Sequence, residues 1–541
     1  MGVGGPLGAL GALGALGALA GAFPGAAAGR GVVGPGGWGP GAGGGRVQGG
    51  FVGVSVELSG VSGYLEDPSR FAAYAELVGG LSGCAGAPGP LGCAGPRMRI
   101  GGNSADRTAW QPSPDAPLPA GASQGFGPRD AEAAGQFAEA VNGSLVFDLN
   151  LAGLGPDYGR QFLEGLRGTS AWARTAAVEV GNEPDLYHGN GYRNATYRYA
   201  AYLDEFRAYL EALAPERSTT AAEELLPAGG LQVGTFCCRW SSCDFLPPMT
   251  SGEYLGALSK RWPVGSVSFH AYSLKQPPNH PIPTLALLMA EDATRGIADF
   301  LAPMVAAARA APGGPIDFWL GEGNTCVKGG AAGVSDAGAS ALWAVDWLFE
   351  LARVGVVGAN LHGGSSAGSL YTPVAFDESG RPLVMPVYYG MRLFAEATRS
   401  SDPRGAELVE KGPSKVACDG TGDPNAPEVK LWAVRRVAES SGSLVTVVAV
   451  HKGLQGAATT CAVAGAGLRV GAAGALRLEM ADPAARGAAA RLTWAGQTWD
   501  GSADGRPIGK RRVEPLAPSP DGSFRFTLAP GSAVVVDLPL A

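Results

Sequence analysis

The sequence has little charge and no long block of either sign. Of its 541 residues 16% are charged, with 41 Lys and Arg against 48 Asp and Glu, so the formal net charge is −7. A chain whose main partner is nucleic acid or an anionic membrane normally carries a basic excess or a basic patch. This balance argues against nucleic acid or an anionic membrane as the main partner. Stable membrane insertion is not expected either, because the Gly-rich N-terminal run is poorly apolar.

Histidine and cysteine are also scarce. The five histidines and eight cysteines do not fall in the spacing of a zinc site. We therefore expect disulfides or free thiols, and neither a metal nor another cofactor. Cys84 and Cys93 bracket a Gly/Pro loop and are candidates to pair, as are Cys418 and Cys461 in the C-terminal region.

Residues 2–28 contain no charged side chain and repeat a Gly-Ala-Leu pattern. Such a run is typical of the apolar region of a secretory signal, with Ala26-Ala27-Ala28 as a small-residue cleavage site. The alternatives are low-complexity sequence or a misassigned start, since no Lys or Arg precedes the run. Residues 1–30 are thus expected to be a signal or low-complexity segment of a protein that is secreted or held in the cell wall. Two sequons, Asn142-Gly143-Ser144 and Asn194-Ala195-Thr196, are compatible with glycosylation.

Eight short apolar runs between residues 51 and 364 alternate with helical patterns. Most runs are continuous, as in strands buried on both faces. Strand and helix alternate in this way in a (β/α)8 TIM barrel, which we expect over residues 31–400. The predicted strands are Phe51–Leu58, Arg97–Ile100, Leu145–Asn150, Ala177–Val180, Leu231–Phe236, Ser266–His270, Asp317–Leu320 and Val356–Leu361. The predicted helices are Pro68–Leu81, Asp130–Val141, Asn194–Leu213, Thr284–Ala311 and Ser335–Arg353.

From about residue 405 the pattern changes to short strands joined by Gly, Asp and Pro turns. No long amphipathic helix intervenes, so residues 405–541 are expected to form an antiparallel β-sandwich domain. Residues 31–50 are a candidate edge strand of this domain. The predicted strands are Val429–Val434, Ser443–His451, Ala475–Met480, Ala490–Trp494 and Phe524–Leu538.

Polar residues end most of the predicted barrel strands. Active sites of such barrels lie at the carboxyl ends of the strands, where residues from several strands converge. Carboxylates, amides and a phenol can each engage vicinal hydroxyls, so the set favours a sugar ligand. The residues are Glu57, Asn103, Asn182, Glu183, His270, Tyr272, Glu322, Asn360 and His362.

Two of these strand ends carry glutamate before a turn, in Val180-Gly181-Asn182-Glu183-Pro184 and Leu320-Gly321-Glu322-Gly323-Asn324. A retaining glycosidase needs one carboxyl group as acid/base and a second as nucleophile, roughly 5–5.5 Å apart. Glu183 is expected to be the acid/base, with a pKa raised by burial and by Glu322. Glu322 is expected to stay ionised, with a hydrogen bond from Tyr272, while Asn182 is expected to bind the sugar 2-hydroxyl.

Each motif also has a structural alternative. Asn182 could cap a helix with Glu183 in its first turn, and Glu322 could be a turn carboxylate. Glu57 could pair with Arg99 or Arg107. The joint occurrence of both glutamates on strands 4 and 7 of one barrel favours catalysis.

At these residues the chain resembles glycoside hydrolase family 79, which contains β-glucuronidases and heparanases. The resemblance covers about residues 50–400 and is carried by four segments. They are Arg99-Ile100-Gly101-Gly102-Asn103-Ser104, Val180-Gly181-Asn182-Glu183-Pro184, Gly321-Glu322-Gly323-Asn324-Thr325, and Asn360-Leu361-His362-Gly363-Gly364 with Tyr371-Thr372-Pro373.

The resemblance implies Glu183 as acid/base and Glu322 as nucleophile, and it places Gly363, Gly364 and Tyr371 where the family holds the uronate carboxylate. The expected function is removal of terminal β-linked glucuronic acid, or its 4-O-methyl derivative, from glycans or proteoglycans. The alternatives are an endo-acting heparanase-like enzyme, another glycosidase of the same clan, and a non-catalytic carbohydrate-binding or cell-wall protein. The motifs are compatible with any oligomeric state.

Overall fold

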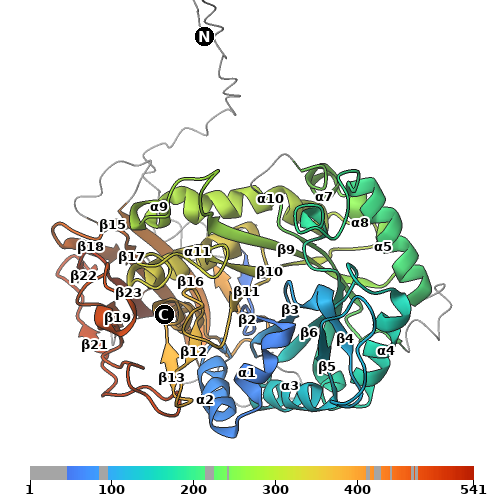
Figure 1. Ribbon diagram of the computed structural model, residues 1–541. Coiled ribbons are helices and arrows are strands. Elements are labelled where there is room, and N and C mark those ends of the chain that lie inside the picture. The colour runs from blue at the N-terminus through green and yellow to red at the C-terminus, as the bar shows by residue number, and fades with distance from the viewer. Residues whose placement is uncertain are drawn as a thin grey trace, which may run out of the picture.

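The computed structural model describes residues 45–84, 95–213, 225–239, 243–409, 415–418, 428–438, 442–464, 468 and 473–540. Within them a closed barrel of eight parallel strands lies beside an antiparallel β-domain (Figure 1). The predicted (β/α)8 barrel and C-terminal β-sandwich are thereby confirmed. The predicted signal segment, residues 1–30, lies outside the described residues and stays a prediction.

The barrel strands follow one another in chain order around the closed sheet, with helices on its outer face. The strands are β2 (Val52–Glu57), β3 (Arg97–Gly101), β6 (Ser144–Leu149), β7 (Thr175–Val180), β8 (Leu231–Phe236), β9 (Val264–Leu274), β10 (Asp317–Cys326) and β11 (Gly358–Gly363). The helices up to the end of the barrel are α1 (Val61–Leu65), α2 (Pro68–Gly79), α3 (Pro128–Ala140), α4 (Pro156–Arg167), α5 (Tyr199–Leu213), α7 (Leu246–Ser251), α8 (Glu253–Leu258), α9 (Leu285–Met289), α10 (Arg295–Arg309) and α11 (Ala339–Val354). A bilayer-spanning helix, long and apolar throughout, does not occur in the part of the chain that the structure describes.

Two neighbouring barrel strands are longer than the sequence predicts. β9 and β10 stay paired as far as Leu274 and Cys326, so Tyr272 and Glu322 lie within the strands instead of after their ends. The pairing register shifts between Leu320 and Glu322, which is a β-bulge. A bulge admits an extra residue and bends the strand without ending it. The turn-like residues around Glu322 therefore mark this irregularity and not a strand end.

The predicted helix Ser335–Arg353 begins only at Ala339, so its predicted start is wrong. Asp336 does not cap the helix, because its carboxylate accepts the backbone N–H of Gly333 (2.7 Å) and pairs with Arg486 of the β-domain. The carboxylate therefore stabilises the loop before the helix.

Two other predicted elements are interrupted. Thr284–Ala311 divides into α9 and α10 because Ala290 adopts an extended conformation. Phe524–Leu538 divides into β22 (Phe524–Leu528) and β23 (Ala533–Pro539), which a turn containing Gly531 separates. In both cases the apolar pattern runs through a short break that hydropathy alone does not reveal.

The β-domain consists of two antiparallel sheets that enclose a small apolar core. The larger sheet contains β1 (Arg46–Val47), β14 (Ala406–Leu408), β16 (Val429–Ala438), β17 (Gly442–His451), β23, β19 (Ala473–Glu479) and β20 (Thr493–Trp494), in that order, with β21 (Glu514–Leu516) on β19. The smaller sheet contains β15 (Lys415–Cys418), β18 (Thr459–Ala464) and β22. A disulfide between Cys418 and Cys461 joins β15 to β18, as predicted, whereas Cys93 of the other predicted pair lies outside the described residues. β1, which precedes the barrel in the chain, forms the edge of the larger sheet.

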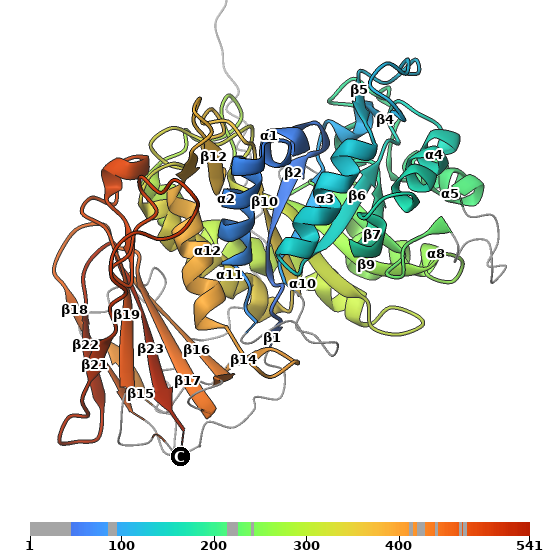
Figure 2. The same ribbon diagram turned by 90° about the horizontal axis from the view of Figure 1, so that it is seen from below.

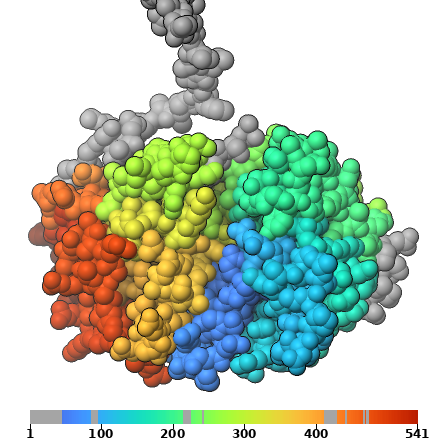
Figure 3. Space-filling model, viewed as in Figure 1, coloured from blue at the N-terminus to red at the C-terminus, as the bar shows by residue number. Residues whose placement is uncertain are grey.

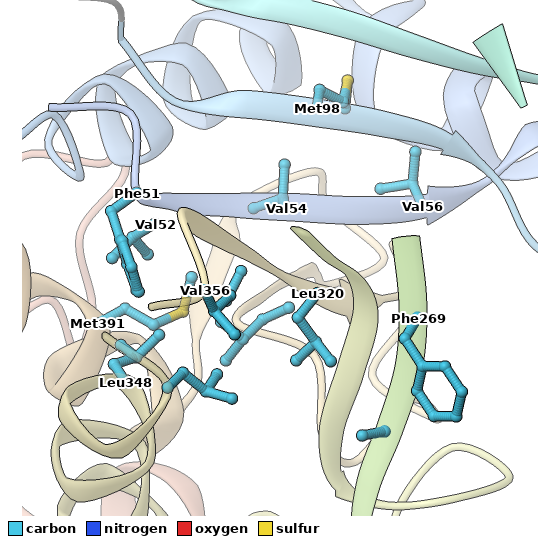
Figure 4. Close-up of a cluster of buried hydrophobic side chains, with 14 of the residues drawn as sticks. Phe51, Val52, Val54, Val56, Met98, Phe269, Leu320, Leu348, Val356 and Met391 are labelled. Atoms are coloured by element: carbon cyan, nitrogen blue, oxygen red, sulfur yellow. The ribbon is translucent and has the colours of Figure 1, made fainter. Parts of the chain in front are cut away.

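Helices α11 and α12 (Pro386–Ala397) lie between the barrel and the larger sheet (Figure 2). In the space-filling view the yellow and orange residues of this region separate the blue and green barrel from the red part of the β-domain (Figure 3). Figure 4 shows Phe51, just before β2, turned toward Leu348 of α11 and Met391 of α12. Because α11 is covered on all sides, Trp343, Trp347 and Phe349 are fully buried.

Buried charges join the two domains. Lys452, which follows β17, is 4% exposed and contacts Asp346 (2.8 Å) and Glu291 (3.0 Å) of the barrel. Lys430 of β16 contacts Glu291 (2.6 Å) and Glu350 (2.8 Å). Burial alone would raise the pKa of Asp346, but the two lysines lower it, so its carboxylate stays ionised. Removing one partner of such a cluster leaves an uncompensated buried charge.

We expect Lys452→Met to lower the free energy of unfolding by about 3 kcal/mol, because Asp346 would lose its nearest cation. Urea unfolding followed by tryptophan fluorescence measures this change. Arg404→Ala is the matched control, since Arg404 is largely exposed and an ion pair at an exposed site contributes little to stability. An unchanged urea midpoint for Lys452→Met would show that the cluster contributes no net stability.

Candidate active site

A cavity of about 490 Å³ opens at the carboxyl ends of the barrel strands. Its lining includes seven of the twelve residues that the sequence nominates for a site. These are Glu57, Asn103, Glu183, Tyr272, Glu322, His362 and Tyr371. These residues lie on strands that are spread around the barrel, or in the segments that follow those strands. This is expected where all the parallel strands end at one mouth of the barrel.

Glu183 follows β7 in a left-handed backbone conformation, with φ 51° and ψ 54°. This conformation is unfavourable for a residue with a Cβ and is found where surrounding contacts hold it, often at functional sites. Here the backbone N–H of Glu183 donates to the carbonyl of Thr235 (3.1 Å), and a short 3₁₀ helix, η4 (Pro184–Leu186), begins directly after it. No helix cap is formed by the side chain of Glu183, and its carboxyl group faces the cavity.

Asp106 holds the loop that carries Glu183. Its buried carboxylate accepts the backbone N–H of Asn182 (3.3 Å) and the hydroxyl of Tyr187 (2.7 Å). Burial raises the pKa of Asp106 to about 7 despite these hydrogen bonds. Sequence reasoning missed Asp106, which lies outside the strand-end motifs.

Glu322 lies at the bulge of β10, and both of its carboxylate oxygens are hydrogen-bonded. The Tyr272 hydroxyl donates to Oε1 (2.6 Å) and the Arg99 guanidinium donates to Oε2 (2.7 Å). Burial alone would raise the pKa of Glu322, but the charges of His362 and Arg99 and the hydrogen bond from Tyr272 lower it to about 2. Glu322 is therefore ionised at any ordinary pH.

The carboxyl group of Glu183 has the opposite protonation preference. Burial, and then the negative charge of Glu322, raise its pKa to about 8. One oxygen of each glutamate lies within 4.8 Å of one oxygen of the other. That upper limit is compatible with the roughly 5–5.5 Å predicted between the carboxyl groups of a retaining pair. At neutral pH the pair thus offers one protonated carboxyl group, Glu183, and one carboxylate anion, Glu322.

The two histidines of the site have different charges. His270 is fully buried, and its Nδ1 lies 3.0 Å from Glu183 Oε1. Burial and the nearby Arg99 lower the pKa of His270 to about 4, so its ring is neutral at pH 7. His362 lies between Glu322 (3.5 Å) and Glu57 (3.8 Å). These two carboxylates raise the pKa of His362 in spite of its burial, which favours its cationic form.

Arg99 lies below the cavity and connects several residues of the site. Its side chain is fully buried and donates to Glu179 (2.7 Å), Asn182 (3.0 Å) and Asp148 (3.4 Å) in addition to Glu322. A guanidinium without solvent must have its donors satisfied by anions or polar groups. The sequence analysis considered Arg99 only as a possible partner of Glu57. Glu57 instead accepts the N–H and hydroxyl of Ser104, and it pairs with neither Arg99 nor Arg107.

Five nominated residues do not line the cavity, and two of them, His270 and Asn360, are fully buried. Asn182 is 2% exposed, and its amide lies between Arg99 and Asn103, so the structure places it behind the wall that a ligand would touch. Gly363 and Gly364 face Thr372 and Ser369 of the following loop. Tyr371 is therefore the one member of the predicted carboxylate-binding set that borders the cavity.

Other residues of the lining are not among those that the sequence nominates for a site. They are Leu186, Asn190, Cys237, Cys238, Lys275, Val327, Lys328 and Gly329. Cys238 forms a disulfide with Cys243, while Cys237 is a free thiol hydrogen-bonded to Glu183. Burial raises the pKa of Cys237 well above its usual range, so the thiol is neutral.

A group of potential metal ligands occurs in the described residues at Glu183, His270 and Glu322. Both oxygens of Glu322 are already hydrogen-bonded, one of them to a guanidinium at 2.7 Å. A positive charge so close opposes a bound cation. A second group contains Cys238 and Cys243, whose sulfur atoms form a disulfide and are not thiolates. These donor sets do not fit a metal ion.

Comparison with known proteins shows a shared fold. No family model matches the chain, and no curated protein matches it. A 4-O-α-L-rhamnosyl-β-D-glucuronidase from Fusarium oxysporum 12S is similar in structure, with a TM-score of 0.69 and 20% identity over 93% of this chain and 99% of that one. A GH51 arabinofuranosidase from Xanthomonas axonopodis pv. citri gives a TM-score of 0.60 and 17% identity over 92% and 98%. A monomeric β-xylosidase from Caulobacter crescentus CB15 gives 0.54 and 12% over 92% and 97%.

We expect Glu322→Gln to lower the pKa of Glu183 from about 8, because the substitution removes the neighbouring negative charge and keeps the side-chain shape. The pKa should stay above that of an exposed glutamate, since burial, the larger cause, remains. The carboxyl ¹³C shift of Glu183, assigned with Glu183→Gln, reports the titration.

The matched control for this titration is Glu407→Gln. Glu407 pairs with Arg435 in the β-domain, so its substitution should leave the pKa of Glu183 unchanged. An equal pKa in the unmodified protein and in Glu322→Gln would mean that burial alone sets the protonation of Glu183.

Proposed function

We propose that the protein is a retaining glycoside hydrolase that removes terminal β-linked glucuronic acid, or its 4-O-methyl derivative, from glycans or proteoglycans. The observation that carries the proposal is the pairing of a protonated Glu183 with an ionised Glu322 across one cavity. The uronic acid is favoured by the family 79 motifs and by the structural likeness to a glucuronidase. Tyr371 offers a phenol to its carboxylate.

The first chemical step forms a bond between a Glu322 oxygen and the anomeric carbon. The bond between the anomeric carbon and the glycosidic oxygen breaks at the same time. Glu183 gives its proton to that oxygen, so the aglycone leaves as a neutral alcohol. The acid assists most where its pKa lies near the working pH, and a pKa of about 8 meets that condition. The transition state carries positive charge on the sugar ring, which the remaining negative charge of Glu322 stabilises.

The second step hydrolyses the glycosyl-enzyme. Once Glu322 is esterified its charge is gone, and the repulsion that helped to raise the pKa of Glu183 disappears with it. Glu183 then has a lower pKa and takes a proton from the attacking water. One residue can thus act as acid and then as base because the charge of its neighbour changes during the reaction. Tyr272 and Arg99 hold Glu322 in place through both steps.

Chromogenic β-glucuronide, β-glucoside, β-xyloside and α-arabinoside test the proposed substrate. We expect the highest kcat/KM on the β-glucuronide, and we expect Glu322→Gln to lower it by about 10⁴-fold or more because the nucleophile is lost. Preference for a neutral sugar would point to the activities named for the arabinofuranosidase and xylosidase neighbours. Binding of glycans without turnover of any of the four substrates would identify a carbohydrate-binding protein.

Glu183→Ala should retain slow glycosylation on substrates whose leaving group needs no protonation. Azide should then restore turnover by attacking the glycosyl-enzyme in place of activated water. The expected product is the β-glycosyl azide, which retention of configuration requires, and NMR of the product identifies it. An α-azide would contradict the double-displacement mechanism, and so would activity of Glu183→Ala equal to that of the unmodified enzyme.

A further inference from the structure

Apart from two lysines, the cavity lining carries more negative than positive charge. Glu57 and Glu322 both border it, and the pKa of each is lowered, so both are ionised. Arg99 also contacts Glu322, but this buried guanidinium is shared with Glu179 and Asp148. His362 lies between Glu57 and Glu322. An anionic sugar that enters therefore meets repulsion unless further positive charge is present.

Two lysines supply that further charge. Lys275 follows the last residue of β9, and Lys328 lies two residues beyond the end of β10. The ends of these strands are adjacent, since Leu274 pairs with Cys326 and accepts the backbone N–H of Val327 (3.2 Å). Both lysines border the cavity.

Neither ammonium group has a hydrogen-bond or ion-pair partner in the described part of the chain. The lysines at the domain junction differ in this respect. Lys430 and Lys452 each contact two or more carboxylates. The two cavity lysines thus keep their full capacity to bind an anion.

The backbone holds Lys328 in a fixed place. It has φ 57°, and Gly329 and Gly330 after it also have positive φ. The loop is fastened on both sides, because Gln276 donates to the Gly330 carbonyl (2.9 Å) and Leu370 donates its N–H to the Gly329 carbonyl (2.8 Å). A left-handed conformation at a residue with a Cβ is strained and persists where neighbours impose it. The same contacts keep Lys328 next to the loop that carries Tyr371.

We propose that Lys275 and Lys328 bind the carboxylate of the sugar acid in the cavity and make the site selective for an anionic sugar. This inference rests on the proposed function and extends it to the source of charge selection. Ammonium groups bind carboxylates through charge-assisted hydrogen bonds, which are about twice as strong as neutral ones. An uncharged sugar of the same shape does not form these charge-assisted hydrogen bonds and so gains no binding energy from them.

The test compares 4-nitrophenyl β-D-glucuronide with its uncharged methyl ester, which differs only at the carboxyl group. We use Lys275→Met and Lys328→Asn, because asparagine tolerates the left-handed conformation of residue 328. Each substitution should lower kcat/KM on the glucuronide about 10-fold and the double substitution about 100-fold, mainly through KM. The ratio of glucuronide to ester activity should fall by the same factors. Lys260→Met, at an exposed lysine that does not border the cavity, is the matched control.

Calorimetric titration with D-glucuronate gives a readout that does not need turnover. If the unmodified enzyme cleaves the glucuronide and the lysine variants keep its glucuronide-to-ester ratio, the inference fails while the proposed function stands. If the enzyme cleaves neither substrate but binds D-glucuronate through the lysines, the proposed function fails and the inference stands. Equal losses on glucuronide and ester would assign the lysines a structural role and overturn the inference. Lys275→Arg and Lys328→Arg should restore most of the affinity.

Discussion

The site depends on one buried guanidinium. Arg99 has no contact with solvent, and its donors reach Glu179 of β7, Glu322 of β10, Asp148 of β6 and the amide of Asn182. It therefore links the strand that carries the ionised Glu322 to the loop that carries the protonated Glu183. A barrel interior of apolar side chains would provide packing but no such link. Here the polar interior fixes the relative position of two groups that are far apart in the chain.

The two glutamates reach the cavity through local departures from regular structure. Glu183 adopts a left-handed conformation at the end of β7, and Glu322 lies at a bulge in β10. Each irregularity turns a side chain in a direction that a straight strand would not give. Asp106 accepts the N–H of Asn182 next to Glu183, while Tyr272 and Arg99 donate to the carboxylate of Glu322, so hydrogen bonds hold both groups in place. Strain and charge are thus concentrated at the same few residues.

Much of this arrangement could be predicted from the sequence, because it depends on local patterns. Apolar runs gave the eight barrel strands, and the residues that follow them gave Glu183, Glu322 and Tyr272. The start of α11 could not be found in this way, because Asp336 serves a contact with Arg486 that lies far along the chain. Arg99 was missed as the central residue for the same reason, since its four partners come together only in the closed barrel. Lys275 and Lys328 stand in loops, where a lysine is ordinarily solvated. The sequence therefore allows Lys328 to attract an acidic substrate but does not place either lysine at the cavity.

The position of β1 has a consequence for how the molecule is assembled. Arg46 and Val47 pair with Glu407 and Ala406, so a strand made before the barrel joins a sheet made after it. During synthesis this edge cannot close until the whole barrel and α12 have left the ribosome. Contacts between residues so far apart in the chain form late, since a long loop must be ordered first. The topology therefore sets the order of assembly. The barrel can close on its own residues, whereas the larger sheet is completed last. That sheet then holds together the two ends of the segment that forms the barrel.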